Sequence, residues 1–262
     1  MITTKAKFSG RQYNQQMKSD EEIWRAKMAG YFSRTKKKIL QANEKYDPTE
    51  LIFQIPQLIP VEPVYSIYDR LYKQLGYKYY RTTRKELLRA ENKAFENKGE
   101  WEQAIQIYID TEVATRITGV TEVRRTITEK AIREAVQEGL ENGYGIEKTK
   151  RLIAQSVDAK WLAMRRNRAR VIARTETITS LNHASYQGAL STGLEVQKAW
   201  LSYKDSRTRE DHYEMNSNDY IPLDADFNVG GQLMLHPGDP RGSAAQVISC
   251  RCGLVYKTPD FI

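Results

Sequence analysis

The sequence predicts an α+β protein that is mainly α-helical, with a helical N-terminal and central stem and a small C-terminal α+β module. Two observations favour this class. None of the eight prolines lies within residues 64–221, and long helices can fill such a stretch because an interior proline removes a backbone donor and clashes with the preceding turn. After Gly193, short segments rich in β-branched and aromatic residues alternate with turns that contain glycine or proline, which is typical of strands.

The chain is therefore expected to have three consecutive parts. Residues 1–63 would form an N-terminal helix and an extended connector that contains proline. Residues 64–193 would form the helical stem, and residues 194–262 the α+β module. The 262 residues, of which 40% are hydrophobic, are enough for one large or two small domains with a hydrophobic core.

The composition excludes two protein classes. Two cysteines are too few for a secreted scaffold held together by disulfides. The longest apolar runs are only a few residues long, whereas a membrane helix needs about 20. We expect a soluble protein without a membrane partner.

The net charge of +8 is unevenly distributed. Residues 201–262 carry six basic and nine acidic side chains, a net of −3, so residues 1–200 carry 35 basic and 24 acidic side chains, a net of +11. Such an excess attracts nucleic acid or an acidic protein surface, but it is also typical of long helices with solvated faces. Charge alone favours the second interpretation, because the acidic residues are interspersed with the basic ones.

Capping and turn signals place the first elements. Ser19-x-x-Glu22 has the form of a capping box and predicts a helix over residues 19–46. Residues 47–49 predict a turn, and residues 54–63, which hold three prolines, predict the extended connector. The next helix carries tyrosines at helical spacing that we expect to be packing surface: Tyr65, Tyr68 and Tyr72.

Three further helices are predicted in the stem. Residues 121–143 end at Asn142-Gly143, a typical helix stop, and a short helix follows Gly145. Residues 158–193, with Asp158 as the N-cap, predict one helix of about 35 residues. The expected apolar face of the first of these helices consists of Val123, Ile127, Ala131, Ala135 and Leu140.

Five arginines and no acidic residue lie within residues 165–174. They are the candidate residues for binding DNA phosphates or an acidic partner surface: Arg165, Arg166, Arg168, Arg170 and Arg174. Guanidinium groups bind phosphates, but they also form internal ion pairs, and Glu176 is a nearby internal partner. The two interpretations are weighed about evenly.

The C-terminal module contains the candidate metal ligands. On a strand, Cys250 and Cys252 would face the same way at a separation that disfavours a disulfide between them. With a slight bend, their thiolates can converge on one soft metal, and His212 and His236 would complete a structural zinc site. The alternative is that both cysteines are small buried hydrophobic residues.

A polar loop precedes His212. Asp205, Arg207 and Arg209 can supply an acid and electrostatic clamps for a hydrolase such as a nuclease, with His212 as the base. They can equally form a structural network, because arginine holds carboxylates and carbonyls together. We favour the network, since no activated nucleophile accompanies these residues.

Several motifs in a fixed order resemble the phage Mu F-like minor head protein family, also called the head-morphogenesis family. The resemblance covers about residues 120–257. The motifs are Arg168-Ala169-x-x-Ile172-Ala173-Arg174-Thr175-Glu176, Asn182-x-Ala184, Trp200, Asp205-Ser206-Arg207-Thr208-Arg209-x-x-His212, Pro237-Gly238-Asp239-Pro240 and Cys250-Arg251-Cys252.

The resemblance implies a minor capsid protein of a tailed phage or prophage. Such a protein associates with the portal protein and with capsid or scaffold proteins in the host cytoplasm, stays inside the head, and supports packaging or ejection of double-stranded DNA. We expect no catalytic activity. The alternative is a nucleic-acid-binding protein or a metal-dependent nuclease that uses Asp205, Arg207, His212, Cys250 and Cys252. The expected structural network consists of Glu176, Asn182, Trp200, Asp205, Arg207, Arg209 and Asp239.

Overall fold

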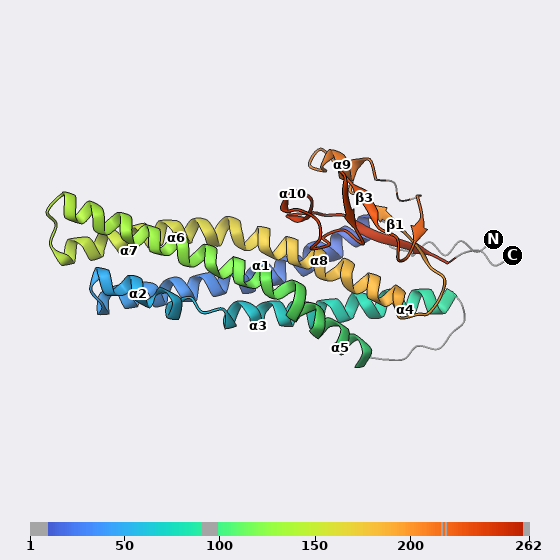
Figure 1. The fold of residues 1–262 in the computed structure, drawn as a ribbon, viewed down its shortest axis with the longest axis horizontal. Helices are drawn as coiled ribbons and strands as arrows, with labels where there is room; N and C mark the ends of the chain where they lie inside the picture. The colour runs from blue at the N-terminus through green and yellow to red at the C-terminus, as the bar shows by residue number, and fades with distance from the viewer. Residues whose placement is uncertain (1–9, 91–98, 216, 218, 259–262) are drawn as a thin grey trace. The chain divides into compact units, whose positions relative to one another are not determined.

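The computed structural model describes residues 10–90, 99–215, 217 and 219–258. Long helices account for most of the described chain, and a few short strands lie near its C-terminus (Figure 1). The mainly helical α+β class is confirmed.

The chain forms two compact units that are interleaved in sequence. One unit contains Met1–Trp24, Asp69–Ile109 and Val171–Ile262, and the other contains Arg25–Tyr68 and Asp110–Arg170. This division differs from the three consecutive parts expected over residues 1–63, 64–193 and 194–262, because single long helices contribute residues to both units.

The unit formed by residues 25–68 and 110–170 is entirely helical within the described chain. Helices α6 and α7 lie side by side and are joined by a tight turn (Figure 1). In the core, the indole N–H of Trp161 donates to Thr128 Oγ1 at 3.1 Å, and Phe32 packs edge-on against the Trp161 ring. The elements that contribute to this unit are α1 (Gly10–Lys45), α2 (Pro48–Leu58), α3 (Glu62–Arg70), η2 (Ile109–Val113), α6 (Ala114–Glu141), α7 (Ile146–Ala163) and the π-helical η3 (Met164–Arg168).

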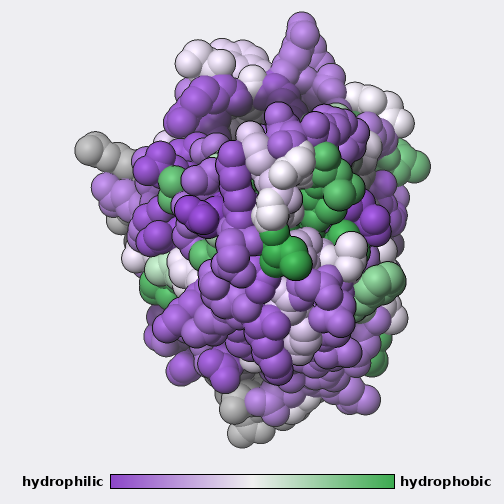
Figure 2. All heavy atoms as spheres, turned by 90° about the vertical axis from the view of Figure 1, so that its left-hand side faces the viewer, coloured by the Kyte–Doolittle hydropathy of each residue, from purple (hydrophilic) through white to green (hydrophobic). Residues whose placement is uncertain are grey.

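Figure 2 shows the molecule from the side on which the α6–α7 turn lies. This surface is mostly hydrophilic, with scattered hydrophobic side chains. Exposed apolar residues of this unit include Phe53, Leu140 and Ile146. Single exposed apolar side chains are normal on protein surfaces, so these residues do not by themselves indicate a binding site.

The other unit combines helices with the C-terminal module. Its helices are the start of α1, η1 (Leu71–Leu75), α4 (Gly76–Ala90), α5 (Gly99–Tyr108) and α8 (Ala169–Leu190). The module contains the strands β1 (Gln197–Leu201), β2 (Ile221–Pro222), β3 (Phe227–Val229), β4 (Gln232–Met234) and β5 (Gly253–Lys257), and the short helices α9 (Glu210–Tyr213) and α10 (Ala244–Val247).

Strand β1 is the centre of the module. It lies between β2 and β5 in an antiparallel sheet, and β3 pairs with β4 in a separate hairpin. The hairpin turns at Gly230-Gly231, where both residues have positive φ values that glycine adopts without strain. Trp200 of β1, opposite Leu254 of β5, is fully buried in the core of the module. The strands expected after Gly193, separated by turns that contain glycine or proline, are confirmed.

The predicted starts of two helices are wrong. Ser19 lies inside α1, which already begins at Gly10, and the acidic residues after Ser19 pair with other helices instead of capping this one. Asp158 likewise lies inside α7, and the backbone continues as helix from Ile146 through η3 to Leu190. Short polar residues cap helices, but they are also common on helix surfaces.

The extended connector expected over residues 54–63 is also wrong. Asp47 caps α2 by accepting from the backbone N–H groups of Thr49 and Glu50, with Pro48 at the first helical position. Pro56 lies inside α2, and Pro63 lies in the first turn of α3, where a missing N–H costs little.

The prediction of which α6 residues form its buried face is only partly confirmed. Ala131 and Ala135 are buried, but Val123 and Leu140 are exposed. Thr121, Arg124 and Thr128 take the inner positions. The guanidinium of Arg124 stacks over the Phe32 ring at 4.2 Å, so its planar face substitutes for an apolar side chain. The tyrosine stripe is confirmed as packing surface, since Tyr68 and Tyr72 are buried.

Candidate functional site

Three polar side chains of α8 fasten two loops of the module. Thr179 Oγ1 donates to Gly238 O at 3.0 Å, and Thr175 Oγ1 accepts from the Ser249 N–H at 3.0 Å. Asn182 donates from Nδ2 to Cys252 O at 3.0 Å. Residues separated by four and three positions lie on one face of a helix, so this face of α8 positions both the loop at Gly238 and the loop with the cysteines.

The cysteines lie in the loop before β5, so the expectation that they occupy a strand is wrong. Ser249 has a φ of +57°, and the Cys250 N–H returns to Val247 O at 3.2 Å. This bend turns both thiols the same way, and the Cys252 N–H donates to Cys250 Sγ at 3.4 Å. Both cysteines are free and buried.

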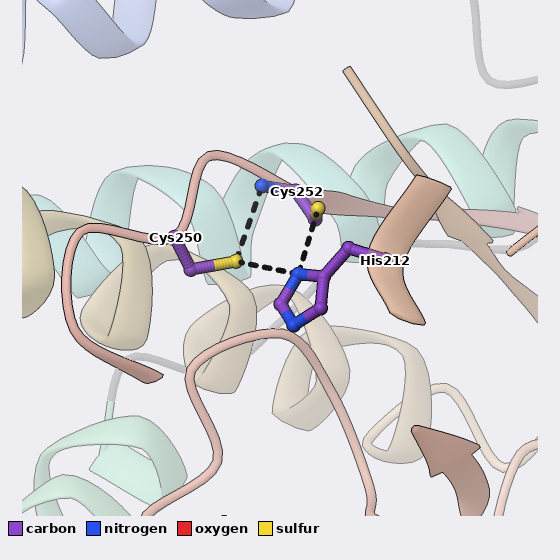
Figure 3. A group of neighbouring side chains, drawn as sticks. All are labelled: His212, Cys250 and Cys252. Atoms are coloured by element: carbon purple, nitrogen blue, oxygen red, sulfur yellow. Dashed lines mark hydrogen bonds between the residues drawn. The ribbon is translucent and has the colours of Figure 1, made fainter. Parts of the chain in front are cut away.

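His212 of α9 joins the two cysteines (Figure 3). Its Nδ1 lies 3.4 Å from Cys252 Sγ and 3.6 Å from Cys250 Sγ. Its Nε2 lies 2.8 Å from Gln246 Oε1, whose amide nitrogen donates to Asp211 Oδ2 at 2.6 Å. Because this chain of bonds makes Gln246 Oε1 the acceptor, His212 carries its proton on Nε2 and directs the Nδ1 lone pair at the sulfurs.

The environment polarises the two thiols in opposite directions. The hydrogen bond from the Cys250 thiol lowers the pKa of Cys252 to about 4 against the opposing effect of burial. The same pairing with Cys252, together with burial, raises the pKa of Cys250. The two thiols therefore differ in acidity, in a site whose three side chains are only 1–2% exposed.

The structure does not bring His236 to this group. The side chains of His212, Cys250 and Cys252 lie within 4.8 Å of one another, and among the described residues His236 is not part of their cluster. Its ring packs near His183 at 5.5 Å, and its Nδ1 bonds to Pro237 O at 3.2 Å. Three residues of the expected four-residue zinc set thus come together, and His236 occupies a separate buried position.

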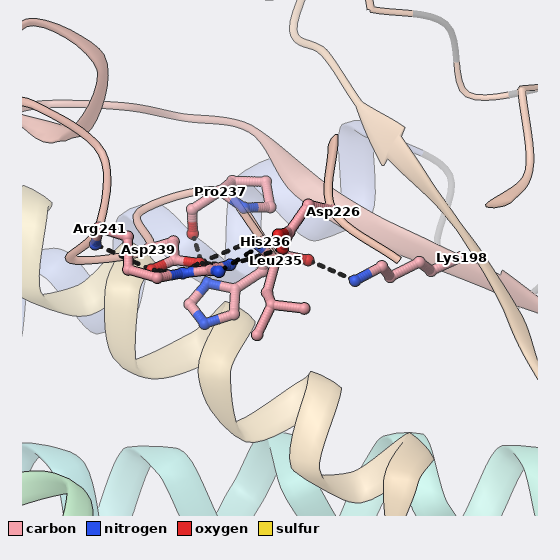
Figure 4. A network of polar contacts seen from close by, with 7 residues as sticks. All are labelled: Lys198, Asp226, Leu235, His236, Pro237, Asp239 and Arg241. Carbon is pink, nitrogen blue, oxygen red and sulfur yellow. Dashed lines mark hydrogen bonds and ion pairs between the residues drawn. The ribbon is translucent and has the colours of Figure 1, made fainter. Parts of the chain in front are cut away.

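The loop around Asp239 is a separate polar network (Figure 4). Asp239 accepts from the Leu235 N–H at 2.6 Å and from Arg241 at 2.8 Å, and Arg241 also bridges to Asp226 at 2.7 Å. Buried Lys198 donates to Leu235 O at 2.7 Å, and burial lowers its pKa to about 8. These bonds fix the chain between β4 and α10.

The loop that precedes α9 is fixed by Asp205. Arg251, next to both cysteines, donates to its two carboxylate oxygens at 2.5 and 2.7 Å, and these bonds lower the pKa of Asp205. Arg209 donates to Ile248 O. Arg207 is exposed and forms a longer ion pair, with its Nη2 atom 3.5 Å from Asp205 Oδ2. Of the remaining expected network residues, Trp200 packs edge-on against the His212 ring at 5.4 Å, and Glu176 accepts from the Tyr72 hydroxyl at 2.7 Å.

The five clustered arginines divide into two kinds. Arg174 forms a bidentate pair with Glu21, with both bonds at 2.9 Å, so Glu176 is not its partner. Arg165, Arg166, Arg168 and Arg170 are exposed, and within the described chain their guanidinium groups form no ion pair. Arg165 and Arg166, together with Arg25, line a groove of about 610 Å³ between α1 and the end of α7.

Sequence reasoning missed the residues that orient this site. The sequence assigns no role to Gln246, Asp211 or Thr179, and it presents Thr175 and Arg251 only as members of family motifs. Both threonines share a helix face with Asn182. This spacing is a detectable signal for a polar helix face that hydrogen-bonds to the backbone of another segment. No local pattern links Gln246 to His212, since 34 residues separate them.

Comparison with known proteins identifies a related family and one distant relative. Residues 130–255 match the family described as Phage Mu protein F like protein. An NAD(+)–arginine ADP-ribosyltransferase EFV of Enterococcus faecalis is 26% identical over 114 residues, which are 44% of this chain and 23% of that protein. The match thus spans less than a quarter of that relative, and nothing of its activity carries over. No solved structure matches the chain significantly.

Within the described residues, no helix is long and apolar enough to span a membrane.

Proposed function

Because this chain is a phage Mu F-like protein over residues 130–255, we propose that it is a minor head protein of a tailed phage or prophage. In this proposal it associates with the portal protein and with capsid or scaffold proteins during assembly in the host cytoplasm. It then remains inside the head and supports DNA packaging or ejection. The family match carries the proposal: it extends from α6 to β5 and includes the polar face of α8, the Gly238 loop and the Cys-x-Cys loop.

A capture experiment with the portal protein of the same phage or prophage tests the proposal. The full-length chain, tagged and mixed with purified portal under assembly conditions, should retain the portal. A portal protein from an unrelated phage serves as the control. Failure to retain the matching portal, or equal retention of both, would contradict the proposal.

We further propose that the exposed arginines contact phosphates of packaged double-stranded DNA. Arg165, Arg166, Arg168 and Arg170 are free to do so, whereas Arg174 is held by Glu21. Each phosphate contact releases counterions, so the logarithm of the affinity should fall steeply with the logarithm of the salt concentration.

Charge reversal of the four exposed arginines to glutamate tests the DNA contact. The slope of the logarithm of the binding constant against the logarithm of the salt concentration should become less negative by about 3 to 4. Each phosphate contact contributes about −0.9 to this slope, and four contacts are lost. A matched control reverses four other basic residues of the same unit: Lys130, Arg133, Lys148 and Arg151. Equal losses in both variants would show that general charge, and not this cluster, binds DNA.

We also propose that the protein is not a nuclease. A catalytic Asp205 would need a free carboxylate, but Arg251 occupies both of its oxygens. Circular DNA incubated with the full-length chain and either Zn²⁺ or Mg²⁺ should stay intact. Cleavage that disappears in a folded Asp205→Asn variant would favour the nuclease alternative instead.

A further inference from the structure

We propose that His212, Cys250 and Cys252 bind one zinc ion through His212 Nδ1 and the two Sγ atoms. This inference goes beyond the head function and does not depend on it. The ion would join the loop at α9 to the loop before β5, two segments that lie 38 residues apart in the sequence.

The spacing of the ligand atoms fits a tetrahedral zinc ion. With Zn–S bonds of about 2.3 Å and Zn–N bonds of about 2.0–2.1 Å, neighbouring N and S ligands lie about 3.5 Å apart. The two N···S distances here are 3.4 and 3.6 Å. Both N···S edges therefore match a zinc tetrahedron, and the two sulfurs, which lie within 4.8 Å of each other, would close to about 3.8 Å on the ion.

The surroundings of the three side chains prepare them as ligands. Gln246 fixes the Nε2–H tautomer of His212, which leaves Nδ1 free to coordinate. The Cys252 N–H donates to Cys250 Sγ, a bond that favours a thiolate. Asp211 orients Gln246 in turn, so both a ligand and the group behind it are held in place.

The donor set selects zinc over harder ions. Two thiolates and an imidazole suit a borderline-soft tetrahedral ion, whereas Mg²⁺ and Ca²⁺ require oxygen ligands. Within the described chain no fourth Cys, His, Asp or Glu side chain joins the group, so a water molecule would complete the coordination. On binding, the Cys250 thiol proton is released to solvent.

The zinc content of purified full-length protein tests the proposal. Protein produced with zinc in the medium and then dialysed should retain about one zinc per chain by elemental analysis. His212→Gln should lower this content at least tenfold, because losing one of three protein ligands removes most of the affinity. His236→Gln is the matched control, because it changes an equally buried histidine outside the group and should keep the zinc.

Cobalt substitution of the unmodified chain gives a second readout that no folding defect can obscure. Co²⁺ added to metal-free protein should produce tetrahedral visible bands and a thiolate charge-transfer band, and one equivalent of Zn²⁺ should abolish both. Wild-type protein that lacks stoichiometric zinc and gives no such bands would overturn the proposal. So would His212→Gln protein that retains the wild-type zinc content.

Discussion

At the scale of single residues, the most informative contrast is between neighbouring arginines. Arg170 and Arg174 are one turn apart on α8, yet Arg170 is exposed and Arg174 is held by the nearly buried Glu21. The sequence does not distinguish an internal ion pair from an external contact here, because nothing local reveals that Glu21, 153 residues away, faces this turn.

Alanine substitutions of Arg174 and Arg170 should differ in their effect on stability, because only Arg174 forms an internal ion pair. Arg174→Ala leaves the Glu21 carboxylate without its partner and should lower the free energy of unfolding by about 2 kcal/mol. Arg170→Ala should change it by less than about 0.5 kcal/mol. Urea denaturation of both variants measures the difference, and similar stabilities would show that the Glu21 pair contributes little.

His236 should make stability depend on pH. Its burial lowers its pKa from 6.5 to about 4, although nearby Asp239 opposes this and Lys198 and Arg241 add to it. Between these values the unfolded chain binds a proton that the native chain does not, so the free energy of unfolding is greatest above pH 6.5 and falls as the pH drops toward 4.

Urea denaturation at pH 7 and at about pH 4.5 tests this dependence. The wild type should lose about 2 kcal/mol more than His236→Gln over this interval, from about 1.4 kcal/mol per pH unit. Both proteins keep the His212 and cysteine group, so the difference isolates His236. Parallel losses in the two proteins would exclude His236 as the titrating group.

At the scale of elements, the Gly238 loop lies directly on α8. Gly238 has a φ of +79°, and a Cβ there would lie 2.8 Å from Thr179 Oγ1 and 3.1 Å from Thr179 Cα. Gly231 has the same φ but open space around it. The pair therefore separates backbone strain from close packing.

Alanine at the two glycines should have unequal costs. Gly231→Ala should cost about 1 to 2 kcal/mol from the left-handed backbone alone. Gly238→Ala should cost about 1 to 3 kcal/mol more, because it also pushes the loop off α8. Thermal unfolding compares them, and equal costs would mean that the loop can move away freely.

Helices and strands were predictable where the sequence pattern is compatible with one structure. They were not predictable where a residue type, such as proline, is common in two different structures. The strand at Trp200, the Gly230-Gly231 hairpin and the helix stop at Asn142-Gly143 rest on unambiguous patterns. Pro48 and Pro63 instead begin helices, because proline serves an extended connector and a first helical turn equally well.

The candidate metal ligands were predictable only in part. Cys-x-Cys and a histidine in the same module indicate a soft-metal site, and His212 meets both cysteines. His236 belongs to the same module and carries the same side chain, so only the three-dimensional path of its loop along α8 separates it from the group.

At the scale of the whole molecule, the exposed basic segment lies within the phage Mu F-like region, residues 130–255. The acidic C-terminal module is fastened to α8 by polar bonds, while the free arginines precede it on the same continuous helix. In the proposed function, the basic segment would contact DNA inside the head and the module would serve as a folded anchor.

The content of purified phage heads tests the proposed head function most directly. Quantitative mass spectrometry should find this chain in both procapsids and mature heads, at few copies relative to the capsid protein. It should be depleted from heads assembled without the portal protein. Absence from procapsids, or equal amounts with and without the portal, would contradict the account.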